Sequence, residues 1–164
     1  MESSEKQKNI QTGKTRQFCT FVLSERLFGV DILAVREVNS TAAFTPIFHA
    51  PKEIKGYFNI RGQIHLILDL RQLLGYTPAV TTSESRLVLF KPEVGENFGV
   101  LVDRIGEAVS VQENQIEEWN KEAPEESGAE TQGMANLSLG VCKLDKILML
   151  ILDPQKFLKA FKTD

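Results

Sequence analysis

The chain of 164 residues is poor in the residue types that build metal and redox centres: it has two cysteines, two histidines and one tryptophan. Cys19 and Cys142 lie far apart, each in an apolar alternating run. That setting favours buried, reduced thiols in a cytoplasmic protein over a disulfide. Because the cysteines and histidines stand at unrelated spacings, they form no metal-binding signature, and we expect no metal site.

Long apolar runs and an excess of positive charge are also missing. No run approaches the roughly 20 residues of a membrane helix, so we expect no membrane insertion. The formal net charge is −3, and a mildly acidic chain lacks the basic patch that nucleic-acid binding requires. Residues 1–16 contain no apolar segment, so we expect no secretory signal there and predict a disordered tail.

What the sequence does contain is a series of short strand patterns. Apolar residues make up 42% of the chain and charged residues 25%, an ordinary globular mix. Pairs of apolar, β-branched segments separated by polar or glycine turns predict hairpins, at 17–24 with 26–32, 85–92 with 97–103, and 139–144 with 146–153. Many short strands with frequent turns favour an all-β barrel or sandwich over a βαβ fold.

Two short helices complete the predicted elements. Residues 70–75 end at a glycine stop, and residues 154–162 begin with a proline and place Phe157, Leu158 and Phe161 on one face. Asp69 and Asp153 each precede one of these segments, which favours helix N-caps over a catalytic carboxylate pair.

Several connecting segments remain to be placed. Residues 31–38 fit either a helical face or an irregular strand, and residues 52–56 are expected to form a short turn ending at Gly56. Residues 76–84 look like a linker between two lobes of similar size. Residues 117–133 carry six glutamates against one lysine and predict a solvated acidic loop.

The sequence gives no indication of catalysis. His49 lies in a proline-rich loop and His65 in a strand, and neither has a nucleophile or carboxylate motif near it. Glycine-rich phosphate loops are absent as well. We therefore expect a protein that is not an enzyme.

Arg61 is the unusual residue, because it stands beside Gly62 inside the most apolar part of the chain, residues 54–75. It can be a turn residue that reaches water, a catalytic group, or a contact for a partner. Arginines exposed among apolar residues are enriched at interaction hot spots, which keeps the structural and the binding interpretations open.

An ordered set of motifs resembles the CheW-type coupling proteins of bacterial chemotaxis. The set covers roughly residues 17–157 and leaves 158–164 as the end of the C-terminal helix. The motifs are FGVDILAVREV, TPI, AP, IKGYFNIRGQI, LILDLRQLLG, FGVLVDRIGEAVSV, GVCKLD and MLILD. The resemblance implies two five-stranded, SH3-like β-barrels packed on each other with an apolar crevice between them, no enzymatic activity and no cofactor.

The resemblance also implies partners and a location. Family members join the cytoplasmic signalling tips of methyl-accepting chemoreceptors to the regulatory domain of the histidine kinase CheA, in arrays on the inner face of the membrane. The family's receptor-binding positions fall on Val35, Gly56, Arg61 and, with the loosest match, Ala108. From the residues alone, Val35 can equally be core and Gly56 can equally be a helix C-cap.

The chain departs from the family pattern after the arginine-glycine pair. His65 replaces an apolar residue and Leu66 replaces proline. The departure leaves the identity of the partners open: they can belong to a chemotaxis array or to a related system that controls pili, gliding or development. A domain that senses a small molecule between the barrels is the alternative of a different class, and a cavity lined by Arg61 and His65 would favour it.

Overall fold

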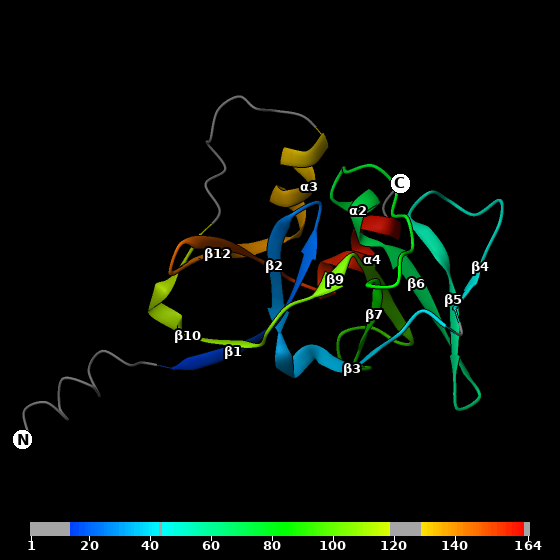
Figure 1. Cartoon of the computed structure of the whole chain (residues 1–164), viewed down its shortest axis with the longest axis horizontal. Helices are drawn as coiled ribbons and strands as arrows, with labels where there is room; N and C mark the ends of the chain where they lie inside the picture. Colours follow the sequence, from blue (N-terminus) through cyan, green and yellow to red (C-terminus); the bar gives the residue numbers. More distant parts are fainter. Residues whose placement is uncertain (1–13, 43, 119–128, 163–164) are drawn as a thin grey trace, which may run out of the picture.

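A computed structural model describes residues 14–42, 44–118 and 129–162, which form two β-sheets lying side by side with short helices at their junction (Figure 1). The architecture is all-β and SH3-like, as predicted. The two sheets contain seven and six strands, more than the five expected of each barrel, because several strands are only two to four residues long.

The first sheet has the strand order β10-β1-β2-β13-β12-β11, with β9 also paired to β1. Its strands are β1 (Thr15–Leu23), β2 (Arg26–Asp31), β9 (Arg104–Ile105), β10 (Val109–Gln112), β11 (Ile116–Glu117), β12 (Ser138–Leu144) and β13 (Ile147–Leu152). The predicted hairpins β1–β2 and β12–β13 are confirmed. Strand β1 begins at Thr15, so the last two residues assigned to a disordered tail are in the sheet instead; residues 1–13 lie outside the described chain.

The second sheet has the order β3-β7-β8-β6-β5-β4. Its strands are β3 (Val35–Asn39), β4 (Phe44–Pro46), β5 (Ile54–Ile60), β6 (Gln63–Asp69), β7 (Arg86–Phe90) and β8 (Phe98–Val102). The β7–β8 hairpin is confirmed. The ambiguous segment 31–38 divides into the 3₁₀ turn η1 (Ile32–Ala34), capped by Asp31, and strand β3.

The prediction that residues 76–84 divide the two lobes is wrong. This segment joins α2 (Leu70–Leu73) to β7, and both belong to the second lobe. The chain instead enters the second sheet through η1 and leaves it at Asp103, the single residue between β8 and β9. Crossings this short leave no stretch rich in glycine, proline or serine, so composition could not reveal them.

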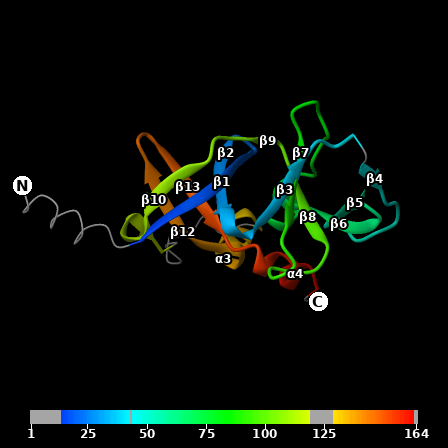
Figure 2. The same ribbon diagram turned by 90° about the horizontal axis from the view of Figure 1, so that it is seen from below.

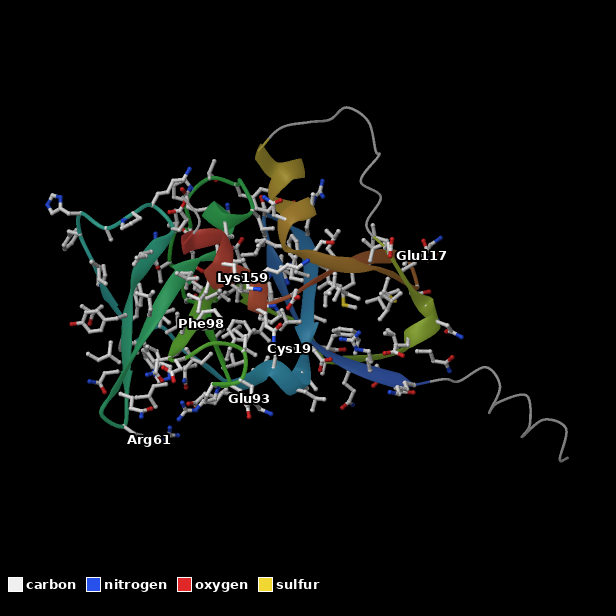
Figure 3. The ribbon with its side chains drawn as sticks, turned by 180° about the vertical axis from the view of Figure 1, so that it is seen from behind. Cys19, Arg61, Glu93, Phe98, Glu117 and Lys159 are labelled. Atoms are coloured by element: carbon white, nitrogen blue, oxygen red, sulfur yellow. The ribbon has the colours of Figure 1, made fainter. Side chains whose placement is uncertain are left out.

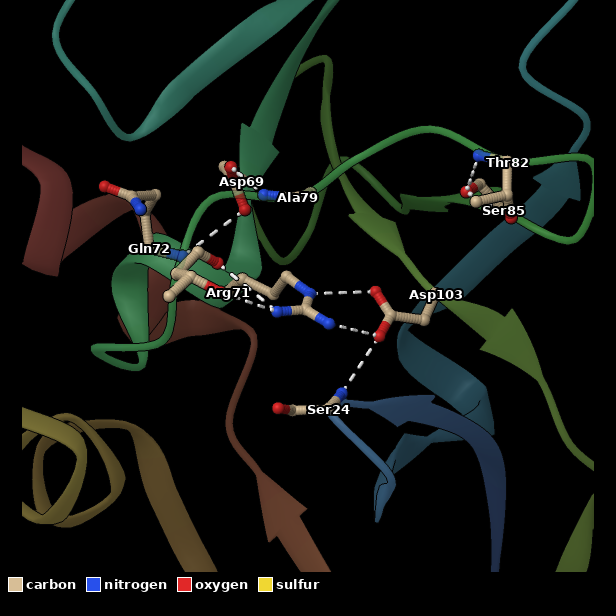
Figure 4. A network of polar contacts seen from close by, with 9 residues as sticks. Ser24, Asp69, Arg71, Gln72, Ala79, Thr82, Ser85 and Asp103 are labelled. Atoms are coloured by element: carbon tan, nitrogen blue, oxygen red, sulfur yellow. Dashed lines mark hydrogen bonds and ion pairs between the residues drawn. The ribbon is translucent and has the colours of Figure 1, made fainter.

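Residues 76–84 are tied to the second sheet by Asp69, whose side chain is 1% exposed. Its carboxylate accepts hydrogen bonds from the Gln72 amide at 3.3 Å and from the Ala79 amide at 3.1 Å (Figure 4). Lys55 Nζ reaches the Ala79 carbonyl at 2.8 Å. The N-cap predicted for Asp69 is therefore confirmed, and the same carboxylate also anchors the connection that follows.

The helices lie where the two lobes meet (Figure 2). Helix α4 (Gln155–Lys162) confirms the C-terminal prediction, and Asp153 Oδ1 accepts from the Gln155 amide at 3.1 Å. Helix α3 (Ala129–Leu137) corrects the acidic-loop prediction, because residues 129–133 are helical. Residues 119–128 lie outside the described chain, and the 3₁₀ turn η2 (Glu113–Gln115) precedes β11.

The largest buried cluster is shared by both lobes. It joins Phe21 and Phe28 of the first sheet to Phe90 and Phe98 of the second and to Phe157 of α4, all at most 1% exposed. The Phe90 ring lies 5.1 Å from that of Phe98 and 5.9 Å from that of Phe157. Each lobe also has a smaller buried apolar cluster of its own. Because aromatic burial is a major contribution to stability, the common cluster holds the lobes together.

Candidate partner-binding surface

Arg61 lies at the tip of the β5–β6 hairpin, where its side chain is 69% exposed (Figure 3). Ile60 pairs with Gln63, so Arg61 and Gly62 form a two-residue turn with φ angles of 48° and 87°. Positive φ at both positions is typical of the turns that match strand twist, and the Gly62 amide donates to Asn59 Oδ1 at 3.1 Å. The turn thus places Arg61 between two strands, although it stands in the most apolar part of the sequence.

Strand β3 brings two charged residues toward this hairpin. The pairing of β3 with β7 shifts between Val35 and Glu37, so Arg36 is the extra residue of a bulge. A bulge changes the direction of neighbouring side chains. As a result, Arg36 and Glu37 both contact the β5–β6 hairpin, although consecutive strand residues ordinarily point to opposite faces.

Glu37 connects the two arginines. Its Oε2 atom lies 3.7 Å from Arg61 Nη1 and 4.0 Å from Arg36 Nε. The same oxygen is buried and accepts no hydrogen bond from the described residues, so the two guanidinium groups are its nearest charged neighbours among them. Residues Arg36, Glu37 and Arg61 are called the β3–hairpin cluster below.

His65, on β6, completes the surroundings of this cluster. It is 0% exposed, and its Nε2 lies 3.3 Å from Arg36 Nη1. A guanidinium can only donate, so Nε2 accepts and the ring carries its proton on Nδ1, 3.4 Å from the Gln63 carbonyl oxygen. The interpretation of His65 as a strand residue with a satisfied ring agrees with these contacts.

Val35 is half-buried against the shared core, opposite Phe90 in the neighbouring strand. Val35 directly follows Ala34, which lines a groove of about 330 Å³ between the lobes. Leu33 and Ala34 come from η1, Val94 from the β7–β8 connection, and Leu139 from β12. Leu33 is 73% exposed and Leu139 44%, so the groove presents apolar side chains to solvent. This groove, called the apolar groove below, also has the charged side chains of Arg16, Asp31 and Asp153 in its lining. It is a candidate for the interlobe crevice that the resemblance implies, which stays a prediction.

Gly56 is buried in the interior of β5, so the interpretation as a helix C-cap is wrong. A Cβ atom at this position would lie 2.7 Å from the Phe44 ring and still closer to the Thr45 carbonyl oxygen. The absent side chain lets β4 pass directly beside β5. Gly56 therefore has a structural role that the sequence did not reveal.

The four residues expected to bind the receptor do not form one cluster. Val35 lies two residues before Glu37, the ion-pair partner of Arg61, so Val35 and Arg61 belong to one region. Gly56 is five residues from Arg61 along β5, about 17 Å at the strand rise. Ala108 is exposed just before β10 of the other sheet, in a connection rather than in a strand.

A second cleft, of about 450 Å³, opens between the lobes. Its lining includes Arg71 of α2, Asp103 between β8 and β9, and Glu25 of the β1–β2 turn. Neither this cleft nor the apolar groove is lined by Arg61 or His65, so neither is the cavity that would favour a small-molecule sensor. Within the described ranges, no three metal-ligating side chains gather.

Arg36 and Glu37 were missed as site residues by the sequence reasoning. The sequence signal that could have identified them is a pair of opposite charges at neighbouring positions. The pair lies in a segment that fits two secondary structures. Both thiols lie away from the cluster: Cys19 is half-buried and Cys142 buried, and burial raises the pKa of each.

Comparison with known proteins matches residues 17–162 to the model of the CheW-like domain. The chain belongs to the CheW-like family. The chemotaxis protein CheW of Klebsiella aerogenes is 30% identical over 145 residues, which cover 88% of this chain and 82% of that protein. The chemotaxis protein CheW of Treponema pallidum is 30% identical over 105 residues. The match spans 62% of this chain and only 61% of the Treponema protein.

A solved structure agrees with this assignment. The scaffolding protein TtCheW from Thermoanaerobacter tengcongensis superposes with a TM-score of 0.71 at 26% identity, over 85% of this chain and 89% of that one. CheW-like proteins are scaffold and coupling proteins, which confirms the expectation that the chain is not an enzyme. In the described part of the chain, no helix is long and apolar enough to cross a membrane.

Proposed function

We propose that this CheW-like chain couples the cytoplasmic signalling tips of chemoreceptors to the regulatory domain of a CheA-type histidine kinase. The observation that carries the proposal is the β3–hairpin cluster next to Val35, which itself follows Ala34 in the lining of the apolar groove. An exposed arginine next to apolar side chains is the composition of an interaction hot spot. A receptor helix could place apolar residues in the groove and polar ones against Arg61.

In this proposal Val35 and Arg61 are direct contacts for the receptor. Gly56 acts indirectly, by allowing β4 and β5 to pack closely and so holding the β5–β6 hairpin in place. Ala108 lies in the connection that precedes β10 of the first sheet and would meet a separate surface of a partner. Binding at receptor tips would place the chain in arrays at the inner face of the membrane.

The partners can instead belong to a chemotaxis-like system that controls pili, gliding or development. The same surface would serve either system, because the β3–hairpin cluster recognises a protein surface and not the output of the pathway. Testing receptor and kinase fragments from both kinds of system, encoded in the same genome, distinguishes the two.

The test is co-sedimentation of the purified chain with vesicles that display receptor signalling fragments, with and without the kinase. We expect the chain to sediment with receptor vesicles and to bring the kinase with it. Lys146→Glu is the matched control for Arg61→Glu, because both reverse a charge at an exposed hairpin tip. A chain that binds neither receptor nor kinase contradicts the proposal.

A further inference from the structure

The packing of a strand interior does not require a hydrogen bond such as the one between Arg36 and His65. A fully buried strand position is ordinarily filled by an apolar side chain, since a buried polar ring costs free energy unless it is hydrogen-bonded. His65 is 0% exposed, yet its Nε2 accepts a hydrogen bond from the guanidinium of Arg36, a residue at the surface. The hydrogen bond therefore restrains Arg36 at the surface as well as satisfying the histidine.

The restrained guanidinium still has donors available. Arg36 uses Nη1 on His65, and its Nε lies 4.0 Å from Glu37 Oε2. A guanidinium offers five N–H donors in a fixed plane, a geometry that matches a carboxylate. Among the residues that the structure describes, Arg36 and Arg61 form ion pairs with one carboxylate, that of Glu37, so the β3–hairpin cluster itself has an excess of one positive charge.

We infer that the β3–hairpin cluster binds an acidic side chain of the receptor signalling tip through Arg36, and that His65 is the positioning residue that holds Arg36 for this contact. Holding a long side chain in one orientation before binding lowers the entropy lost on association. A carboxylate would be attracted by the net positive charge of this surface, whereas a cation would be repelled by the two arginines. This inference rests on the proposed receptor coupling and specifies its chemistry.

The first test measures the affinity of the full chain for receptor signalling fragments on vesicles as a function of salt. Arg36→Ala should raise the dissociation constant about tenfold at low salt. It should also make binding less sensitive to added salt, since one screened contact is lost. Lys146→Ala removes one positive charge from an exposed hairpin tip of the first sheet and should leave both quantities unchanged.

The second test asks whether His65 acts through its acceptor atom. His65→Leu removes the acceptor and should weaken receptor binding about fivefold. His65→Gln can place an amide oxygen close to the position of Nε2 and should restore most of the affinity. In an Arg36→Ala background, His65→Leu should cause no further loss, because the two residues act as one unit.

The outcomes separate this inference from the proposed function. A wild-type chain that does not bind receptor fragments overturns both. A wild-type chain that binds, with Arg36→Ala binding equally well at all salt concentrations, overturns the inference and leaves receptor coupling intact. If His65→Leu lowers the thermal melt, Arg36→Ala still decides, because Arg36 is at the surface. His65→Gln binding as weakly as His65→Leu would contradict the positioning role.

Discussion

Arg71 and Asp103 form a two-point ion pair across the junction of the lobes, with Nε to Oδ1 at 3.0 Å and Nη2 to Oδ2 at 2.9 Å (Figure 4). Asp103 Oδ2 also accepts from the Ser24 amide in the β1–β2 turn at 2.9 Å. Asp103 is the residue at which the chain passes from the second sheet to the first. The pair therefore fixes one crossing point between the lobes.

The other crossing point is arranged in the same way. Asp31 ends β2, and its Oδ1 accepts from the Leu33 amide at 2.9 Å as the cap of η1. Its Oδ2 accepts from Arg16 at 2.9 Å. Each passage between the sheets thus has one aspartate that accepts from both a backbone amide and an arginine. Only the pair of Asp103 with Arg71 joins the two lobes, because Arg16 and Asp31 both belong to the first sheet.

Protonation of Asp103 is expected to weaken the junction in acid. Partial burial opposes ionisation of this carboxyl, but hydrogen bonds from Arg71 and from the Ser24 amide outweigh it, so the pKa of Asp103 lies below its ordinary value. A group with a depressed folded-state pKa contributes stability above its unfolded pKa and loses it as pH falls through the folded one. This contribution should therefore begin to decline below about pH 5 and be lost as the pH falls through the depressed folded-state pKa of Asp103.

Replacing Asp103 by asparagine tests this dependence. Asp103→Asn should lower the free energy of unfolding by about 1 kcal/mol at pH 7, as expected for a partly exposed pair. The deficit should shrink as pH falls, measured by urea unfolding between pH 7 and pH 3. Asp145→Asn, at the exposed β12–β13 turn, should change neither the free energy of unfolding at pH 7 nor its dependence on pH. A deficit of equal size at every pH would show that Asp103 does not act through its charge.

Substitution of Gly56 should destabilise the fold before it affects binding. In Gly56→Ala the new methyl group would meet the Phe44 ring and the Thr45 carbonyl, so we expect a loss of about 2–3 kcal/mol. Gly62→Ala makes no such contact and should cost about 1 kcal/mol through its positive φ alone. Thermal melts compare the two, and equal melting temperatures would contradict the close packing of β4 on β5.

Charge reversal at Arg61 should separate binding from stability. The side chain is exposed and its nearest carboxylate oxygen is 3.7 Å away, so the ion pair with Glu37 contributes at most about 1 kcal/mol. Arg61→Glu should leave the thermal melt near that of the wild type and weaken pull-down of the receptor or the kinase about tenfold. An unfolded Arg61→Glu protein would instead make Arg61 a structural residue.

Asp69 should be among the least replaceable polar residues of the second lobe. Asp69→Ala removes the cap of α2 and leaves the buried Ala79 amide without its acceptor, and should cost about 3 kcal/mol. Asp69→Asn keeps one acceptor oxygen and should cost less. Urea unfolding of both variants measures this order, and a reversed order would mean that the carboxylate is not the anchor of residues 76–84.

Most of the longer strands, their hairpins and the two predicted helices could be read from the sequence because their signals are local. The short strands β4, β9 and β11 and helix α3 were not predicted. Alternating apolar residues around the Ser24-Glu25 and Asp145-Lys146 turns identify β1–β2 and β12–β13 directly. The allocation of strands to sheets could not be predicted this way. It depends on which short connector crosses between the lobes, and the crossing at Asp103 is one residue long.

The candidate site was predicted only in part, for a similar reason. Arg61 is visible in the sequence because it interrupts an apolar segment. Glu37 reaches it through a bulge in β3, and the buried His65 supports Arg36 from a strand that is not hydrogen-bonded to β3. The role of Gly56 depends on the path of β4, which no local pattern indicates.

The most direct measurement of the proposed coupling is the autophosphorylation rate of a CheA-type kinase in the presence of receptor signalling fragments on vesicles, with and without this chain. We expect the receptor to change the kinase rate only when the chain is present, and Arg61→Glu to remove most of this dependence while Lys146→Glu does not. A kinase rate that is the same with and without the chain would contradict receptor coupling.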